Sequence, residues 1–318
     1  MQLLTVIALT LLGYASTAPT SDGTKKYVIT KDVYVDSFVI YTGEYEIVNI
    51  IVPLNGLNYG VNADSKYLFF FVEADYESGS RIDKGLYVFK NDEPKKLLEN
   101  GRDAAAANDE GKEAYIAADD GIYLYDDEKI SVEKYGTITD SIIGIAKPSG
   151  SDLIYILTED KVVYKVTEGG ERKEKIEEIV AAEQIVVDYN NNLYYVDADN
   201  QIYIYKTGEV IKLEGVPKKS IQAKLLKPSL LSDNSLLYIV DGSLYLIKDD
   251  EAKLLDYIEI SPDTEPSAYG VEPGWMQYYA KDKKIYQYDL LYLELSYFET
   301  LLGEIEDLFR ALFALLLS

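Results

Sequence analysis

Acidic residues recur in short polar turns of this sequence, where carboxylate oxygens could bind a cation. They lie in turns at 118–121, 158–161, 197–200 and 240–243, and they are Asp119, Asp120, Glu159, Asp160, Asp197, Asp199 and Asp241. Calcium takes about six to eight oxygen ligands. However, Asp, Asn and Gly are also common turn formers, and none of these turns shows the Asp-x-Asp-x-Asp-Gly pattern with a distal glutamate. We therefore interpret them as turns and predict no metal ligand.

Two residue types that carry much enzyme chemistry are absent, because the chain has no histidine and no cysteine. Their absence excludes histidine-based triads, histidine general bases, disulfides and the usual zinc ligands. A hydrolase would need Asp, Asn and Glu around a divalent ion, with a carboxylate or lysine as base. The nearest candidates are Asn62, Asn108 and Asp188, at the ends of apolar runs. We predict no catalytic residue, no cofactor and no enzymatic activity.

Aromatic side chains are abundant, with 30 tyrosines and one tryptophan. Most tyrosines are expected to pack between strands, with the hydroxyl at a sheet edge. A minority could line a cavity and stack on a planar ligand. The candidate ligand-binding residues flank the first strands of repeat units or the connections between units, and they are Tyr59, Tyr189, Tyr269 and Trp275.

A tyrosine-marked hairpin recurs along the chain, and residues 192–206 are its clearest copy. Two runs rich in β-branched and aromatic residues, 193–196 and 202–205, flank a polar turn. The paired tyrosines are Tyr67 with Tyr87, Tyr115 with Tyr123, Tyr155 with Tyr164, Tyr194 with Tyr203, Tyr238 with Tyr245, and Tyr278 with Tyr286. Successive opening tyrosines are 39 to 48 residues apart, which matches propeller blades of about 40–50 residues.

Each copy also has an apolar run before the hairpin, such as 184–188, and another after it, such as 210–213. Four short strands per copy predict an all-β fold, a six-bladed β-propeller over residues 27–289. The first blade is expected from about Asn55 to Glu99, with a long polar loop from Glu73 to Lys84. Part of the stretch from Tyr27 to Pro53 is expected to complete the last blade and close the ring.

The two ends of the chain differ from the repeats. Residues 1–18 resemble a secretory signal, with an apolar core followed by small residues, which predicts a secreted, extracellular protein. Residues 290–318 are predicted to form an amphipathic helix, with apolar residues at helical spacing. That helix could pack on one end of the propeller or mediate self-association. Membrane docking is disfavoured because Arg310 is its only basic residue.

The formal net charge is −24 and the pI is about 4.4. Such a surface repels phosphate backbones and anionic lipid headgroups, so neither nucleic acid nor a membrane is an expected partner. The charge also favours solubility.

With the hairpins in place, the sequence resembles the ommochrome-binding proteins of moth haemolymph. The resemblance is carried by residues 104–125, which include an Asp-Gly-Ile-Tyr hairpin, and by residues 188–196, which include Asn-Leu-Tyr-Tyr, and it extends loosely from Asn58 to Tyr288. It implies a secreted protein that binds tryptophan-derived phenoxazinone pigments. The N-terminal cysteines of that family are absent here, and the helical tail is a second departure.

Three hypotheses follow. The first is a secreted, non-enzymatic carrier for a small planar aromatic molecule, such as an ommochrome or related pigment. The second is a metal-dependent hydrolase of the gluconolactonase-like propeller class. The third is a protein-interaction scaffold that uses the C-terminal helix as its contact.

Overall fold

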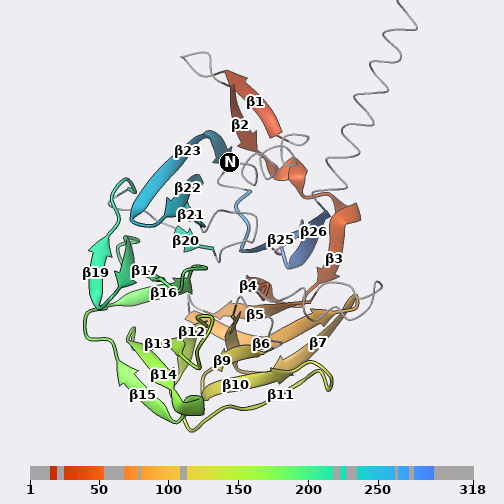
Figure 1. The fold of residues 1–318 in the computed structure, drawn as a ribbon. Coiled ribbons are helices and arrows are strands. Elements are labelled where there is room, and N and C mark those ends of the chain that lie inside the picture. The colour runs from red at the N-terminus through yellow and green to blue at the C-terminus, as the bar shows by residue number, and fades with distance from the viewer. Residues whose placement is uncertain are drawn as a thin grey trace, which may run out of the picture.

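A computed structural model describes residues 15–19, 25–53, 68–77, 80–107, 113–217, 223–226, 235–261, 264–271 and 276–289. In this part of the chain, six β-sheets are arranged radially around one axis, and the first strand of each blade lies nearest that axis (Figure 1). The chain is therefore an all-β, six-bladed propeller, as the repeat predicted.

Neighbouring strands within each blade are antiparallel. Blade 1 contains β4 (Glu46–Ile51), β5 (Phe69–Glu77), β6 (Ser80–Lys90) and β7 (Glu93–Leu98). Blade 2 contains β8 (Gly101–Ala106), β9 (Ala114–Ala118), β10 (Gly121–Asp126) and β11 (Ser131–Lys134). Blade 3 contains β12 (Ile142–Ala146), β13 (Ile154–Thr158), β14 (Val163–Thr167) and β15 (Arg172–Lys175).

The second half of the ring follows the same plan. Blade 4 contains β16 (Ala182–Val187), β17 (Leu193–Asp197), β18 (Ile202–Lys206) and β19 (Glu209–Lys212). Blade 5 contains β20 (Ala223–Leu225), β21 (Leu236–Val240), β22 (Ser243–Lys248) and β23 (Glu251–Ile260). Blade 6 contains β24 (Ala268–Val271), β25 (Met276–Lys281), β26 (Lys284–Asp289) and β3 (Val39–Thr42).

An apolar cluster joins each blade to the next, so both faces of every blade are buried. Strand β8, which is rich in alanine, shows how one strand packs against both neighbouring blades. Ala104 and Ala106 pack toward blade 1, whereas Ala105 belongs to the cluster shared with blade 3. Because each face meets an apolar neighbour, a strict alternation of apolar and polar residues is neither needed nor present.

The N-terminal segment closes the ring at two blades. As predicted for part of residues 27–53, β3 pairs with β26 and becomes the outer strand of blade 6. Before it, β2 (Lys25–Ile29) pairs in parallel with β23 of blade 5, and β1 (Ala15–Pro19) pairs with β2. Between these strands, Tyr34 contacts Tyr286 and Phe38 contacts Tyr288, with ring centroids 5.0 Å apart in both pairs. Two edges that would otherwise be exposed are thus covered.

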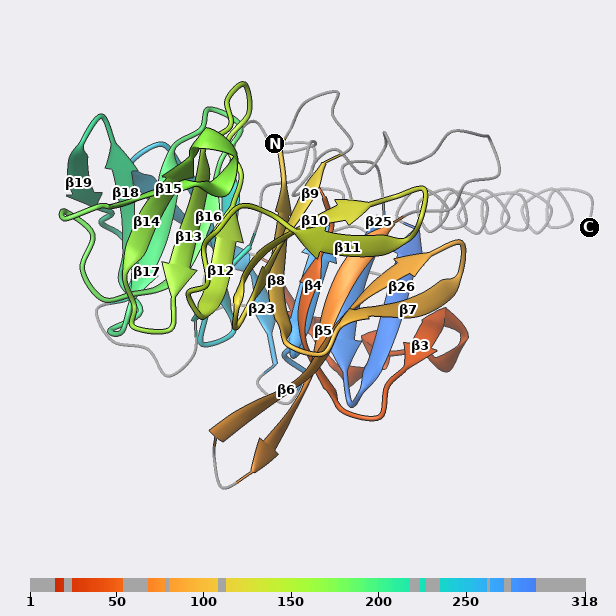
Figure 2. The same ribbon diagram turned by 90° about the horizontal axis from the view of Figure 1, so that it is seen from below.

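Two details of the prediction for blade 1 are wrong. The blade begins at Glu46 rather than at about Asn55, because β4 is its inner strand. The stretch from Glu73 to Lys84 is a continuation of the β5–β6 hairpin rather than a loop, with Tyr76 opposite Arg81. This hairpin projects beyond the other blades (Figure 2). Cross-strand pairs hold it although its residues are polar.

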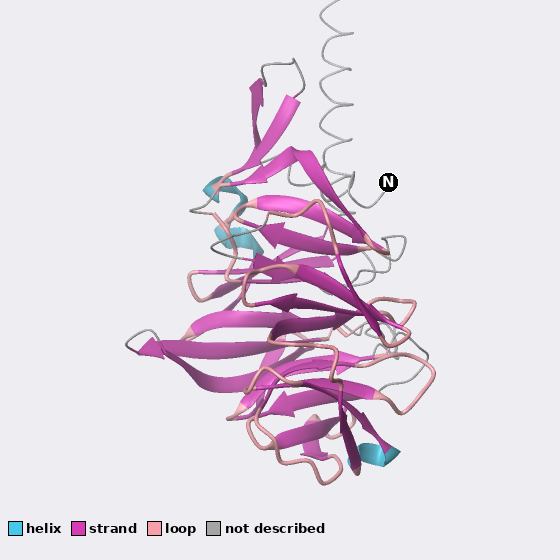
Figure 3. Cartoon of the chain, turned by 90° about the vertical axis from the view of Figure 1, so that its left-hand side faces the viewer, coloured by secondary structure: helices cyan, strands magenta, loops and turns pink. Residues whose placement is uncertain are grey.

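Helical structure in the described residues is limited to three short 3-10 turns (cyan in Figure 3). η1 (Lys31–Val33) and η2 (Asp36–Phe38) precede β3, and η4 (Glu168–Gly170) lies between β14 and β15 of blade 3. The helix predicted over 290–318 lies outside the described residues, as do residues 1–14 of the predicted signal and Tyr67. None of the described helices is long and apolar enough to cross a membrane.

Candidate functional site

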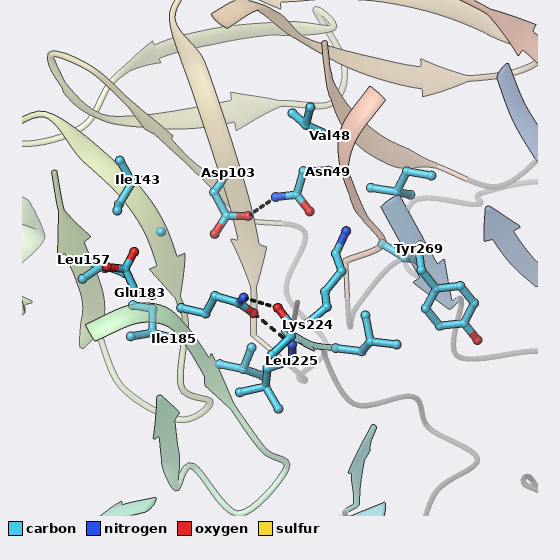
Figure 4. Close-up of a pocket in the computed structure, with 18 of the residues that line it drawn as sticks. Val48, Asn49, Asp103, Ile143, Leu157, Glu183, Ile185, Lys224, Leu225 and Tyr269 are labelled. Carbon is cyan, nitrogen blue, oxygen red and sulfur yellow. Dashed lines mark hydrogen bonds between the residues drawn. The ribbon is translucent and has the colours of Figure 1, made fainter. Parts of the chain in front are cut away.

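A cavity of about 380 Å³ lies at the centre of the ring, and the inner strands of the blades form its wall. Val48 and Asn49 come from β4, Gln184 from β16, and Lys224 from β20 (Figure 4). At one end the cavity opens into a wider space of about 940 Å³, and Val48, Gln184 and Lys224 line both spaces. The wider space is its mouth, because it is also lined by residues from the turns between second and third strands.

Four inner strands share a β-bulge at the same place. The pairing register shifts by one residue at Val48 in β4, Arg102 in β8, Ile143 in β12 and Glu183 in β16. A bulge turns a side chain away from the regular alternation of a strand. Val48, Ile143 and Glu183 line the cavity as a result. Val48 and Glu183 also line the mouth, whereas Ile143 lines the cavity alone.

Polar side chains directly after the bulges bridge neighbouring inner strands. Asp103 is buried, accepting a hydrogen bond from Asn49 Nδ2 at 3.1 Å and one from the Ile145 backbone N–H at 2.9 Å. It thereby ties blade 2 to blades 1 and 3. Gln184 does the same between blades 4 and 5, donating to the Ala223 carbonyl and accepting from the Leu225 N–H, both at 2.9 Å. These bonds fix the wall of the cavity (Figure 4).

Lys224 is a cation that extends into this cavity (Figure 4). Its Nζ donates a hydrogen bond to the Ser267 carbonyl at 2.9 Å. Burial lowers the pKa of Lys224 to about 8, the nearby charge of Glu265 opposes this change, and the charge of Arg81 adds to it. Burial raises the pKa of Glu265, against the opposing charge of Lys224. At neutral pH, Lys224 is therefore mainly an ammonium ion.

The β5–β6 hairpin contributes Tyr76 and Arg81 to the mouth. Arg81 Nε lies 2.7 Å from one oxygen of Asp83, and Arg102 Nε lies 2.7 Å from the other. Arg102 Nη1 in turn donates to Ser141 Oγ at 2.7 Å and lies 3.5 Å from Glu159 Oε2. This chain of charges connects the hairpin to blades 2 and 3. It gives the projecting strands a fixed place beside the mouth.

Of the predicted ligand-binding residues, Tyr269 lies in the wall of the cavity. Its ring points away from Lys224 (Figure 4) and packs against Tyr279, with centroids 4.7 Å apart. Tyr189 lies elsewhere, in the β16–β17 turn, where burial raises its pKa. Tyr59 and Trp275 lie outside the described residues. The four residues stay a prediction for ligand binding, with only Tyr269 placed at the cavity.

The acidic turns are turns between second and third strands, as expected. Asp197 Oδ1 accepts backbone N–H bonds from Asp199 and Gln201, and its Oδ2 accepts the Tyr203 hydroxyl. The hydrogen bond from Ser141 and the charge of Arg102 lower the pKa of Glu159. Within the described residues, no group of three or more acids is arranged to hold a metal ion. The carboxylates of Asp197 and Glu159 instead stabilise their own turns and their neighbours.

Asp188, a candidate for the hydrolase hypothesis, is buried in the β16–β17 turn. Its Oδ1 accepts from the backbone N–H groups of Asn190 and Asn192, and its Oδ2 accepts from Asn192 Nδ2. Both oxygens are therefore used by the turn. Asn62 and Asn108 lie outside the described residues.

Sequence reasoning missed the residues that the structure brings together at the cavity, namely Asn49, Arg81, Asp103, Gln184 and Lys224. One signal could have found most of them. Each of these except Arg81 is a polar residue within or just before the first apolar run of a repeat. Arg81 was hidden because its segment was interpreted as a loop.

No protein-family model matches the chain, and no curated protein sequence matches it either. Among solved structures, it is similar to part of PorZ, described as an essential bacterial surface component of the type-IX secretion system of Porphyromonas gingivalis, with 11% sequence identity and a TM-score of 0.49. The match covers 78% of this chain and 37% of the PorZ chain, so this chain spans little more than a third of that protein's length. At this identity and score, the likeness carries no information about function.

Proposed function

We propose that this protein is a secreted, non-enzymatic carrier that holds a small planar aromatic molecule in the central cavity of the propeller. The observation that carries the proposal is the cavity itself, about 380 Å³ in volume and open at one end. Sites for small molecules typically have volumes of about 300–1,000 Å³. A flat molecule could therefore enter from the mouth.

The composition of the wall supports binding. Apolar side chains contribute much of it, including Val48, Ile50, Val52, Leu225 and Leu226. A few polar side chains stand among them, and Asp103 and Gln184 are already fixed by hydrogen bonds to neighbouring strands. Apolar and polar groups both line this cavity, and polar groups held in fixed orientations provide specificity in ligand sites.

The lack of histidine and cysteine supports a carrier rather than an enzyme, because the most common general base and the strongest side-chain nucleophile are missing. The resemblance to ommochrome-binding proteins supports a tryptophan-derived pigment as the ligand. Secretion is proposed from the sequence of residues 1–18.

Titration of the purified protein with a phenoxazinone, followed by ligand absorbance, tests the proposal. We expect saturable binding at one site per chain. The variant Val48→Trp should weaken this binding strongly, because the half-buried Val48 lines both the cavity and its mouth. A larger indole there fills the space that the ligand needs.

The matched control is Ile211→Trp, which places the same side chain on the exposed outer strand β19. It should bind as the unaltered protein does. Binding that both variants retain would place the ligand outside the cavity. No binding by the unaltered protein would refute the carrier proposal for this ligand class.

A further inference from the structure

We propose that the ligand of the central cavity is an organic anion, whose carboxylate is held between Lys224 Nζ and the guanidinium group of Arg81. This inference rests on the proposed function, because it names the chemical class of the molecule that the same cavity takes. It comes from the charges in the wall, not from the aromatic residues.

Lys224 is a cation without a salt-bridge partner in the described part of the chain. Its single hydrogen bond there goes to a neutral carbonyl, that of Ser267. An ammonium group has three N–H donors, so two remain available to the cavity. A half-buried ammonium is stabilised by an anion more than an exposed one is, because the attraction between opposite charges increases as water is excluded.

Arg81 lines both the cavity and its mouth. Its Nε is engaged with Asp83, which shares its other oxygen with Arg102. The Nη groups of Arg81 donate to no acceptor in the residues that the structure describes. Arg81 and Lys224 line the same cavity and the same mouth, and the charge of Arg81 acts on Lys224. Arginine donates in a planar fork that fits a carboxylate.

The acidic residues nearest to the cavity do not act as counter-ions of Lys224 or of the Arg81 Nη groups. Asp103 already accepts hydrogen bonds from the Asn49 side chain and the Ile145 backbone N–H. Glu183 is paired with Lys161, at 2.5 Å. Glu46, Glu265 and Asp282 line the mouth, and in the described residues none of them forms a salt bridge with Lys224 or Arg81. In the described residues, the ammonium group of Lys224 and the Nη groups of Arg81 are therefore not paired with a carboxylate.

The rest of the wall suits the remainder of such a ligand. The apolar residues Ile50, Val52 and Leu226 belong to the cavity but not to the mouth. An aromatic acid would thus place its ring toward these side chains, with its carboxylate toward the mouth. An uncharged ligand of the same shape would leave Lys224 without a counter-ion.

Two matched ligands test this inference by calorimetry at pH 7, quinoline-2-carboxylate and its neutral analogue quinoline-2-carboxamide. We expect the acid to bind about tenfold more tightly or better, as charge-assisted hydrogen bonds allow. Lys224→Met should bring the ratio of the two affinities close to one. Arg81→Gln should lower it by a smaller factor, because the Arg81 side chain is 39% exposed and more screened. Lys212→Met, on exposed β19, should leave the ratio unchanged.

The outcomes separate the two proposals. Equal binding of acid and amide would overturn the anion proposal while the carrier proposal stands. A preference for the acid that survives both Lys224→Met and Arg81→Gln would also overturn it. If neither quinoline binds, the anion proposal fails, because a flat ring with one carboxylate is the simplest ligand that it requires. The phenoxazinone titration then decides the carrier proposal separately.

Discussion

Replacing Lys224 by methionine should make the protein more stable at neutral pH. Burial lowers the pKa of Lys224 from 10.5 to about 8, so the folded state disfavours the charged form. At about 1.4 kcal/mol for each pH unit, the upper limit of this cost is about 3 kcal/mol. Lys224 is half-buried and faces an open cavity, where water weakens the effect. We therefore expect Lys224→Met to raise the free energy of unfolding by about 1–2 kcal/mol at pH 7.

The pH dependence of this gain has a definite sign. Below pH 8, Lys224 is charged in both the folded and the unfolded chain, so the cost of burying the charge is fully present. As the pH rises from about 8 toward 10.5, the folded chain loses this proton first, and the cost disappears. The stability difference between Lys224→Met and the unaltered protein should therefore shrink between pH 7 and pH 9.5.

Urea unfolding, followed by far-ultraviolet circular dichroism at both pH values, measures this difference. The control is Lys147→Met. Lys147 is also buried, but its Nζ donates to the carbonyls of Pro148 at 2.9 Å and Ser151 at 2.5 Å. Removing it leaves both acceptors unpaired, so this variant should lose about 1–3 kcal/mol. A Lys224→Met variant that is less stable than the unaltered protein at pH 7, or equally shifted at both pH values, would refute the reasoning.

Two further variants test how the ring is held. Asp103→Ala should lower the free energy of unfolding by about 2 kcal/mol because it leaves the Ile145 N–H and the Asn49 amide without their acceptor. Asp103→Asn should be nearly neutral, since a flipped Asn49 amide can still bond to it, and urea unfolding of the pair decides the matter. Deleting residues 1–43 removes β3 and exposes the edge of β26, so the melting temperature should fall by about 10 °C or more, with aggregation in size-exclusion chromatography. Deleting residues 1–24 keeps β2 and β3, so this variant should stay folded and elute as the unaltered protein does.

Local signals in the sequence were enough to predict the blades. Each hairpin consists of two short runs and a turn, so its pattern is contained in about 15 residues. Tyr238 lies directly opposite Tyr245, and the pairing of Tyr195 with Tyr203 joins the strands that contain Tyr194 and Tyr203. The spacing of these hairpins then fixed the number of blades.

The errors arose where local and tertiary signals disagree. Residues 73–84 are mostly polar, which is typical of a loop, yet β5 continues to Glu77 and β6 begins at Ser80. Lys84 lies 4.0 Å from Asp75, and Lys84 Nζ lies 4.8 Å from the centroid of the Tyr45 ring. Such contacts stabilise exposed strands without a buried face. The sequence of the hairpin alone does not contain Tyr45, so the prediction could not include that contact.

The residues of the cavity could not be predicted from the sequence for a different reason. Val48, Asp103, Gln184 and Lys224 come from four blades, and no spacing along the chain shows that they meet. Tyrosines were predicted as ligand-binding residues because they are frequent in this chain. However, the ring of Tyr269 packs against Tyr279. The rare polar residues in first strands were the better guide. A single polar residue beside an apolar run does not indicate a site. It does so only when the repeats are aligned and polar residues are found at equivalent positions in several blades.

Local pairing, rather than net charge, decides what this cavity can bind. The chain carries 55 acidic and 31 basic residues, and an average over the surface would predict that anions are repelled. Charges on the outer surface act across water and salt, which screen them within about 10 Å. Inside the ring, Asp103 and Glu183 already have partners, whereas Lys224 is hydrogen-bonded to a carbonyl. The proposed anion site at the axis is therefore compatible with the acidic net charge of the chain.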